Sequence, residues 1–191
     1  ISNSPGLEIT NVGMNPSRTG LLQVLKNMGA DIEARNQRLE SGEPCADLII
    51  KKSMLRGVEL SGNIIPNIID EIPIISIAAA FAEGETIIRD AEELRVKESD
   101  RLKAVSDGFT RLGVAHKNFE DGMSIMGSPN ALLIEQPISI ESHEDHRIAM
   151  SFLIAGLKCS KPIIVKDCKN IFTSFPNFIE LISSIGYKLE K

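Results

Sequence analysis

The sequence contains an internal repeat, and this repeat constrains the fold more than any other feature of the chain. Asp70 and Asp145 each open an apolar, helix-like stretch, and they are 75 residues apart. Ser99 and Ser174 each open an amphipathic stretch and are separated by the same number of residues. Segments of this kind also arise by chance in α/β proteins, but two landmarks with one offset favour a true repeat.

The amphipathic stretches predict helices with defined ends. In three places, a Ser precedes such a stretch, and a Gly follows it and leads into a strand-like run; these segments are residues 17–33, 99–117 and 174–190. Ser suits a helix N-cap because its hydroxyl accepts a bond from a free helix amide. Gly suits the position after a helix because it turns left-handed without strain. We therefore predict a Ser cap and a Gly stop for each helix (Ser17 and Gly29, Ser99 and Gly113, Ser174 and Gly186).

Strand-like runs complete the predicted unit. The stretches that begin at Asp70 and Asp145 lead into runs at 86–89 and 162–165, and the extra strands of the first two units are expected at 46–51 and 122–126. With an entry strand, each unit has the order βαβαββ. The predicted fold class is therefore α/β (α+β), built from pseudo-threefold repeats.

The repeat leaves the first unit incomplete. Three units fit at about 1–62, 63–135 and 136–191, but the first holds only its second half, residues 7–60. A repeat domain usually needs complete units to bury the apolar face of each helix. We therefore expect residues 1–191 to form a single domain from which preceding sequence is missing.

Composition restricts the class of function. Apolar residues make up 42% of the chain, charged residues 25%, and the net charge is −5, which lacks the broad basic surface of a nucleic-acid-binding protein. The three cysteines form no CxxC pair, so neither a disulfide framework nor a zinc ribbon is expected, and a reducing compartment fits. No apolar run reaches about 18 residues, and no signal peptide is evident. A cytoplasmic protein without a membrane partner is expected.

The segment Leu94–Arg101, which reads LRVKESDR, is the first candidate site. It lies between the predicted strand 86–89 and the helix predicted to begin at Ser99, and free amides and the helix dipole at such a point favour anions. Four of its last five residues are charged. Lys97 and Arg101 share a helix face if the helix begins early. On spacing alone, a solvated helix start with a capping box is the stronger interpretation.

The second candidate is the run EDHR that ends at Arg147. His143 and His146 are three residues apart, but a zinc site needs three or four ligands and no third is suitably spaced, so no metal site is predicted. Arg147, on the first turn of an apolar helix, can bind a carboxylate or phosphate through two parallel hydrogen bonds. Its alternative is a surface ion pair with Glu144 or Asp145, which contributes little.

Asp70 is the third candidate. It precedes the apolar helix predicted over 72–82, so on its own it is interpreted as an N-cap, with Pro73 suited to the first turn. Its interest comes from the repeat, because Asp70 occupies in one unit the place that Asp145 occupies in the next.

Several segments together carry a resemblance to a known family. PNIIDEIP, EELRVKESDRL, EDHRIAMSFL and TSFPNF follow one another in this order, after GMNPSRTG, MGADIE and ADLIIK. They resemble the C-terminal half of the 5-enolpyruvylshikimate-3-phosphate synthases, and most closely the bacterial branch called class II, over essentially all 191 residues. The resemblance implies the enolpyruvyl-transferase fold, with two similar domains of three βαβαββ units and substrates bound between them. The N-terminal domain, which is the expected partner, is absent from this chain.

The resemblance also implies a reaction of the shikimate pathway, which leads to chorismate and the aromatic amino acids. An enolpyruvyl group moves from phosphoenolpyruvate to the 5-hydroxyl of shikimate 3-phosphate, and phosphate is released, by addition and elimination without a metal or cofactor. An acid must protonate the methylene carbon of phosphoenolpyruvate, and the same carbon is later deprotonated, so acid and base exchange roles. Cations must hold a carboxylate and a phosphate.

Position by position, the resemblance assigns roles to five residues. Glu98 matches the acid–base residue at the methylene carbon. Asp70 matches the carboxylate that contacts the shikimate hydroxyls and is a candidate base, and Lys97 matches the lysine beside the target hydroxyl. Arg101 and Arg147 match the arginines that bind phosphoenolpyruvate.

Two further positions have no defined role. His146 matches a histidine next to the site whose role the resemblance does not define. Thr173 stands where some family members carry a Lys before a Ser-Phe-Pro or Thr-Phe-Pro turn. Class II members commonly show this difference, so it does not exclude activity.

Two other functions stay open on the sequence. One is an enolpyruvyl transferase that acts on UDP-N-acetylglucosamine and shares the repeat architecture, although LRVKESDR with DHRIAMSF favours the shikimate enzyme. The other is a non-catalytic half-domain, because an isolated half cannot close a cleft around substrates. We predict that the 191-residue chain alone has no synthase activity.

Overall fold

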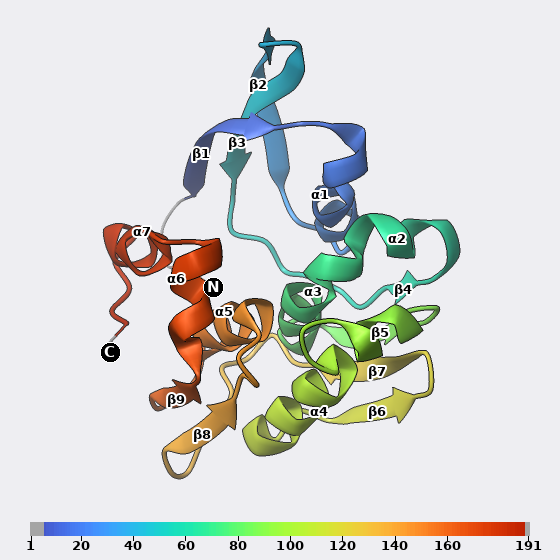
Figure 1. Ribbon diagram of the computed structural model, residues 1–191, viewed down its shortest axis with the longest axis vertical. Helices are drawn as coiled ribbons and strands as arrows, with labels where there is room; N and C mark the ends of the chain where they lie inside the picture. Colours follow the sequence, from blue (N-terminus) through green and yellow to red (C-terminus); the bar gives the residue numbers. More distant parts are fainter. Residues whose placement is uncertain (1–5, 190–191) are drawn as a thin grey trace.

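The middle repeat unit is complete and has the predicted βαβαββ order. The computed structural model describes residues 6–189 and is shown in Figure 1. The elements of this unit are β4 (Glu59–Leu60), α2 (Ile65–Ile68), α3 (Ile72–Ala80), β5 (Gly84–Ile88), α4 (Arg101–Leu112), β6 (His116–Phe119) and β7 (Gly122–Gly127). Its strands form one sheet in the order β4-β5-β7-β6, in which β4 is parallel to β5 and the other neighbours are antiparallel.

The first unit corresponds to the last four elements of the middle unit. It contains β1 (Leu7–Gly13), α1 (Gly20–Asn27), β2 (Ile32–Glu40) and β3 (Glu43–Ile50). Its antiparallel sheet has the order β1-β3-β2, which reproduces the order β5-β7-β6. The prediction that this unit holds only its second half is confirmed for the described residues.

The third unit corresponds to the first part of the middle unit. It contains β8 (Ile138–Glu141), α5 (His146–Gly156), β9 (Ile163–Lys166), α6 (Ile171–Ser174) and α7 (Phe178–Ser184). The strands β8 and β9 are parallel, as β4 and β5 are. The strand predicted at 187–190 is wrong for residues 187–189, which form no strand, and residue 190 lies outside the described part of the chain.

The predicted helix stops are correct, but the predicted Ser caps are wrong. Gly29, Gly113 and Gly186 all have positive φ, from 71° to 97°. Ser17 lies inside a short 3-10 helix, and Ser174 is the last residue of α6. At α4 the carboxylate of Asp100, not the Ser99 hydroxyl, accepts the bond from a free amide, that of Lys103. A carboxylate is the stronger acceptor for a helix amide.

The helices α3, α4 and α5 pack against one another at the centre of the molecule. Ile72, Ile75 and Ile77 of α3 are almost fully buried, together with Phe109 of α4 and Phe152 of α5. This apolar contact holds the three helices in fixed positions. The beginnings of all three helices carry the candidate site residues.

The helical stretch Gly62–Ala80 differs from the expectation that no apolar run is long enough to span a membrane. It has 19 residues and a mean hydropathy of 1.3, which suffices by length and composition. The sequence run looked shorter because Asp70 and Glu71 interrupt it. Half of the stretch is buried inside the structure, so packing in the core accounts for its apolar character.

Candidate active site

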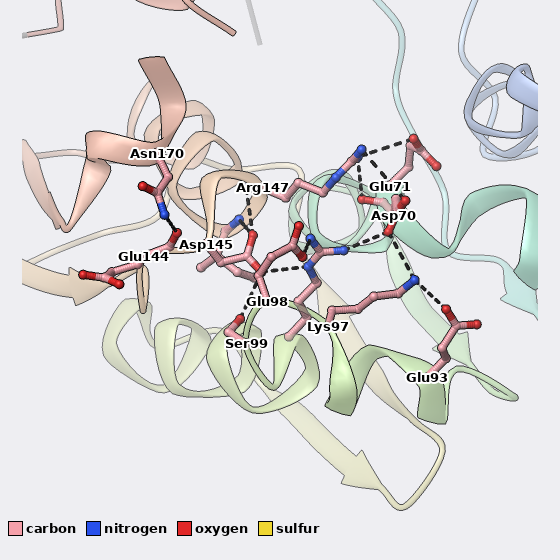
Figure 2. Close-up of polar contacts among 12 residues, drawn as sticks. Asp70, Glu71, Glu93, Lys97, Glu98, Ser99, Glu144, Asp145, Arg147 and Asn170 are labelled. Carbon is pink, nitrogen blue, oxygen red and sulfur yellow. Dashed lines mark hydrogen bonds and ion pairs between the residues drawn. The ribbon is translucent and has the colours of Figure 1, made fainter. Parts of the chain in front are cut away.

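Three helix beginnings meet at one place, which Figure 2 shows in close-up. Asp70 lies in a 3-10 turn directly before α3, the segment 97–100 leads into α4, and Arg147 is the second residue of α5. Asp70 and Arg147 are in direct contact although 77 positions separate them. The structure therefore brings together all three regions that the sequence singled out.

Arg101 lies at the centre of this cluster and is only 1% exposed. Its Nε donates to Oδ2 of Asp145 at 2.8 Å, and its Nη1 donates to Oδ1 of Asp70 at 2.9 Å. Its Nη2 donates to the carboxylate of Glu98. A buried guanidinium is tolerated only where its charge is paired and its hydrogens are bonded. Three carboxylates from three segments meet that requirement here.

Two other cations lie within ion-pair distance of the Asp70 carboxylate. Lys97 Nζ lies 3.7 Å from Asp70 Oδ1, and Arg147 Nη2 lies 4.0 Å from Oδ2. Arg147 Nη1 donates to the main-chain carbonyl of Asp70 at 2.9 Å and lies 3.5 Å from the carboxylate of Glu71. The ion pairs of Arg147 therefore cross to the start of α3 instead of joining the acids next to it in the sequence.

Asp70 forms no helix-capping bond, so its predicted capping role is wrong. The N-cap position of α3 is Glu71, which makes no side-chain cap bond either, and Pro73 occupies the first turn as expected. Burial raises the pKa of Asp70, but the charge of Arg147, the hydrogen bond from Arg101 and the charge of Lys97 outweigh burial, and its pKa lies below the usual value. Asp70 is thus an ionised acceptor, and the lowered pKa weakens it as a general base.

Lys97 lies outside the helix, because α4 begins only at Arg101 and the backbone of Lys97 is extended. It does not share a helix face with Arg101, yet both cations reach the same oxygen of Asp70. The hydrogen bond that Lys97 donates to Glu93 raises the pKa of Lys97, burial opposes this increase, and the charge of Asp70 adds to it, with a net increase. Lys97 is therefore an ammonium at neutral pH.

Glu98 and His146 are the two remaining predicted residues. The side chain of Glu98 is 52% exposed, so its carboxylate is open to a ligand while it pairs with Arg101. His146 is the first residue of α5 and is half-buried. Within residues 6–189, its side chain forms no hydrogen bond or ion pair with this cluster, and no group of three or more acids, histidines and cysteines is arranged to hold a metal ion.

Asp145 belongs to the cluster, although the sequence indicated only a helix start there. It is fully buried, and its Oδ1 caps α5 by accepting from the amides of Arg147 at 2.9 Å and Ile148 at 3.4 Å. Its Oδ2 accepts from Arg101 and from the hydroxyl of Ser99 at 3.1 Å. The repeat held the signal, because Asp145 is the counterpart of Asp70. The Ser99 hydroxyl serves this bond and not the predicted helix cap.

Comparison with known proteins shows the family. The profile of the family described as EPSP synthase (3-phosphoshikimate 1-carboxyvinyltransferase) matches residues 1–182. The chain belongs to the EPSP synthase family. This match favours the shikimate enzyme over the alternative of a UDP-N-acetylglucosamine enolpyruvyl transferase.

Individual EPSP synthases agree with this assignment over nearly the whole chain. The 3-phosphoshikimate 1-carboxyvinyltransferase of Magnetococcus marinus is 47% identical over 189 residues, which are 98% of this chain and 42% of the relative. That of Geotalea daltonii is 48% identical over 183 residues, 95% of this chain and 42% of the relative. The chain therefore spans well under half the length of these relatives.

Solved structures agree in fold. The EPSP synthase from Acinetobacter baumannii superimposes with a TM-score of 0.91 at 43% identity, over 97% of this chain and 42% of that one. The enolpyruvyl transferase NikO from Streptomyces tendae superimposes with a TM-score of 0.73 at 19% identity, over 97% of this chain and 40% of that one. The second likeness concerns the fold alone. The predicted enolpyruvyl-transferase fold is confirmed.

Proposed function

We propose that this chain is the C-terminal domain of a two-domain 3-phosphoshikimate 1-carboxyvinyltransferase and forms one wall of its active site. In this proposal, the domain consists of the units expected at about 1–62, 63–135 and 136–191, except that the middle unit begins earlier, at β4, which pairs with β5. The N-terminal domain is its partner. The observation that carries the proposal is the convergence of Asp70, Glu98, Arg101 and Arg147 in a member of this family. The proposed substrates are shikimate 3-phosphate and phosphoenolpyruvate, with no nucleic acid or membrane partner and a cytoplasmic location.

Arg101 and Arg147 are the proposed ligands of phosphoenolpyruvate. A guanidinium binds a carboxylate or phosphate through parallel N–H donors. Acidic side chains now occupy those donors, Glu98 on Arg101 and Glu71 on Arg147. Both carboxylates are partly exposed, so an incoming anion can take their place without unpacking the core. His146, beside Arg147, is a lesser candidate for substrate contact.

Glu98 is the proposed acid–base residue. In the addition step, protonated Glu98 gives its proton to the methylene carbon of phosphoenolpyruvate, while the 5-hydroxyl oxygen bonds to the adjacent carbon and releases its own proton. In the elimination step, a proton leaves the new methyl group, the C–O bond to phosphate breaks and the double bond returns. The side chain that gave the first proton thus takes one back.

Asp70 and Lys97 are the proposed residues at the acceptor hydroxyl. The lowered pKa of Asp70 suits a carboxylate that accepts hydrogen bonds from sugar-like hydroxyls. The Lys97 ammonium, 3.7 Å from Asp70, can stabilise the negative charge that develops on the oxygen as it loses its proton. Asp70 therefore orients the acceptor hydroxyl and takes its proton, while the charge of Lys97 stabilises the oxygen that loses the proton.

The complete protein with Glu98→Gln tests this proposal, and Glu93→Gln provides a matched control. Glu93 is also an exposed glutamate of this region and bonds Lys97 instead of Arg101. We expect Glu98→Gln to slow phosphate release from the two substrates by about 10²- to 10⁴-fold, the usual contribution of an acid–base group, and Glu93→Gln to change it only a few-fold. Both variants should keep the circular dichroism spectrum of the parent.

Near-normal turnover in Glu98→Gln would contradict the role of Glu98. Replacing shikimate 3-phosphate with UDP-N-acetylglucosamine in the same assay separates the two enolpyruvyl transferase activities. We expect phosphate release with shikimate 3-phosphate alone, and release with the UDP-sugar instead would overturn the proposed substrate.

A further inference from the structure

Asp145 is the most deeply buried acid of the cluster. Its side chain is fully buried, and its two oxygens accept four hydrogen bonds. Burial raises the pKa of Asp145, but the hydrogen bond and charge of Arg101 and the two backbone amides outweigh it, and its pKa lies below the usual range. Asp145 is therefore a fixed negative charge that lies behind the exposed part of the cluster.

The two oxygens of Asp145 serve two different helices. Oδ1 bonds the first free amides of α5, including that of Arg147, whereas Oδ2 bonds Arg101 and Ser99 at the start of α4. One rigid carboxylate thus sets the position of the start of α5 relative to the Arg101 side chain. Figure 2 shows Asp145 beside Arg147 and Ser99.

The bond to Nε decides which part of Arg101 remains available. An arginine side chain has four rotatable bonds and loses much freedom when it is held in one place. Because Asp145 takes Nε, the two Nη groups point to the other side, where they contact Asp70 and Glu98. The donors that face the partly exposed carboxylates are therefore oriented before any ligand arrives, which is the condition for tight binding of a planar anion.

We propose that Asp145 is a positioning residue. It holds the guanidinium of Arg101 and the start of α5, which carries Arg147, in the relative positions that one ligand with two anionic groups requires. This inference rests on the proposed function, in which that ligand is phosphoenolpyruvate. Asp145 itself touches no substrate, since it has no exposed surface. It acts through Arg101 by its side chain bond and through Arg147 by the backbone amide.

Asp100 offers a matched control for a purely structural role. It is also an aspartate N-cap, at α4, where its Oδ1 accepts from the amide of Lys103 at 2.9 Å. Its Oδ2 pairs with Arg95 at 3.1 Å and not with Arg101. Asp100→Asn and Asp145→Asn therefore both remove the charge of a capping carboxylate, but only the second changes the partner of Arg101.

Steady-state kinetics of the complete protein test the proposal. Asp145→Asn should raise the KM for phosphoenolpyruvate by about 10- to 100-fold, the range for a lost hydrogen bond to a charged group. The KM for shikimate 3-phosphate should change less than about 3-fold, and Asp100→Asn should change neither constant by more than that. An unchanged KM for phosphoenolpyruvate in Asp145→Asn, or a loss confined to kcat, would overturn the proposal. A merely structural defect lowers the fraction of active enzyme, which reduces the apparent kcat and leaves KM unchanged.

Ser99→Ala covers the case in which Asp145→Asn does not fold. It removes one neutral hydrogen bond to Oδ2 and leaves the carboxylate in place. We expect it to raise the KM for phosphoenolpyruvate by about 2- to 10-fold. If Asp145→Asn fails to fold and Ser99→Ala leaves this KM unchanged, the proposal is overturned.

A binding-independent readout separates this inference from the proposed function. In complete protein labelled with ¹⁵N-arginine, the Arg101 Nε–H should exchange slowly with solvent, and its exchange should accelerate at least about 10-fold in Asp145→Asn and not in Asp100→Asn. If the parent protein releases no phosphate, the proposed function fails, and this signal still decides whether Asp145 fixes Arg101. Equal exchange in both variants overturns the positioning role even if the enzyme is active.

Discussion

The middle and third repeat units begin alike and end differently. In each unit, an apolar helix connects two parallel strands, β4 and β5 in the middle unit and β8 and β9 in the third. In the middle unit, β7 and β6 then extend the sheet, and Met123 and Ile125 of β7 are fully buried. In the third unit, α6 and α7 follow, and no further strand pairs with β9 within residues 6–189. Several apolar side chains of this unit are 40–58% exposed (Ile164, Phe175, Leu181 and Ile185).

This difference teaches where the rigidity of the site comes from. Arg101 belongs to the complete unit, whereas Asp145 and Arg147 belong to the start of the third unit. The helix α5 packs against α3 and α4, and Asp145, Ile148 and Ala149 at its start are fully buried. The exposed apolar side chains lie in β9, α6–α7 and the residues between and just after them, away from the cluster. We call the contact between Arg101 of the middle unit and Asp145 of the third unit the junction. We expect substitutions to have large effects at the junction and within the complete middle unit, and small effects beyond α5.

The largest effect on folding is expected at the junction. Asp145→Ala leaves Arg101, 1% exposed, without its most buried partner. Loss of one partner of a buried ion pair lowers the free energy of unfolding by about 3–5 kcal/mol. Urea denaturation of the 191-residue chain measures this change. Asp100→Ala, which removes a partly exposed cap, should lower it by only about 1 kcal/mol, and equal effects would contradict a special role for the junction.

The next largest effect is expected from a comparison of one glycine in the middle unit with one in the third unit. A Cβ on Gly122, in β7, would lie 2.0 Å from the carbonyl oxygen of Ile88, whereas a Cβ on Gly156, in α5, would meet only the Ile163 side chain at 3.0 Å. Gly122→Ala should destabilise the chain by about 1–3 kcal/mol or more, because backbone must shift. Gly156→Ala should change stability by less than about 1 kcal/mol, since helix propensity offsets the contact. Thermal unfolding of both variants measures the two changes in stability, and a larger loss of stability in Gly156→Ala than in Gly122→Ala would contradict the prediction.

A smaller effect is expected on acidification. The pKa values of Asp70 and Asp145 lie below the usual value in the folded chain, so their stabilising effect is fully present above the unfolded pKa of about 3.9. It is lost as the pH falls through the lower folded pKa values. Stability should therefore decrease below about pH 4, and the decrease should be shallower in Asp145→Asn. Urea midpoints between pH 7 and pH 2.5 measure this, and parallel curves for parent and variant would contradict the assignment.

Much of the fold and most members of the candidate cluster could be predicted from the sequence. The apolar helices α3 and α5 and the strands β3, β5, β7 and β9 follow from runs of apolar residues and from the repeat, because buried elements are rich in apolar residues. The glycine stops follow from the need for positive φ. The repeat relates the starts of α3 and α5, and the family resemblance places Asp70 and Arg147 in one site.

The predictions that failed depend on tertiary contacts. Ser99 and Asp100 are both good caps, and only the presence of Asp145 decides that Ser99 bonds elsewhere. Asp70 does not cap α3 because it lies one residue before the N-cap position, inside a 3-10 turn, and its carboxylate pairs with Arg101 from another helix. The run after Gly186 has a strand-like composition, but a strand needs a neighbour with free backbone groups. None of these partners can be seen in a local stretch of sequence.

Phosphate release by the isolated chain and by the complete protein is the most direct test of the central claim, that this chain holds one half of an enolpyruvyl-transfer site. Both proteins are assayed with phosphoenolpyruvate and shikimate 3-phosphate, together and one at a time. We expect the complete protein to release phosphate only when both substrates are present, and the 191-residue chain to release none above background, because it cannot close around them. Turnover by the 191-residue chain alone, at a rate comparable with that of the complete protein, would contradict the claim.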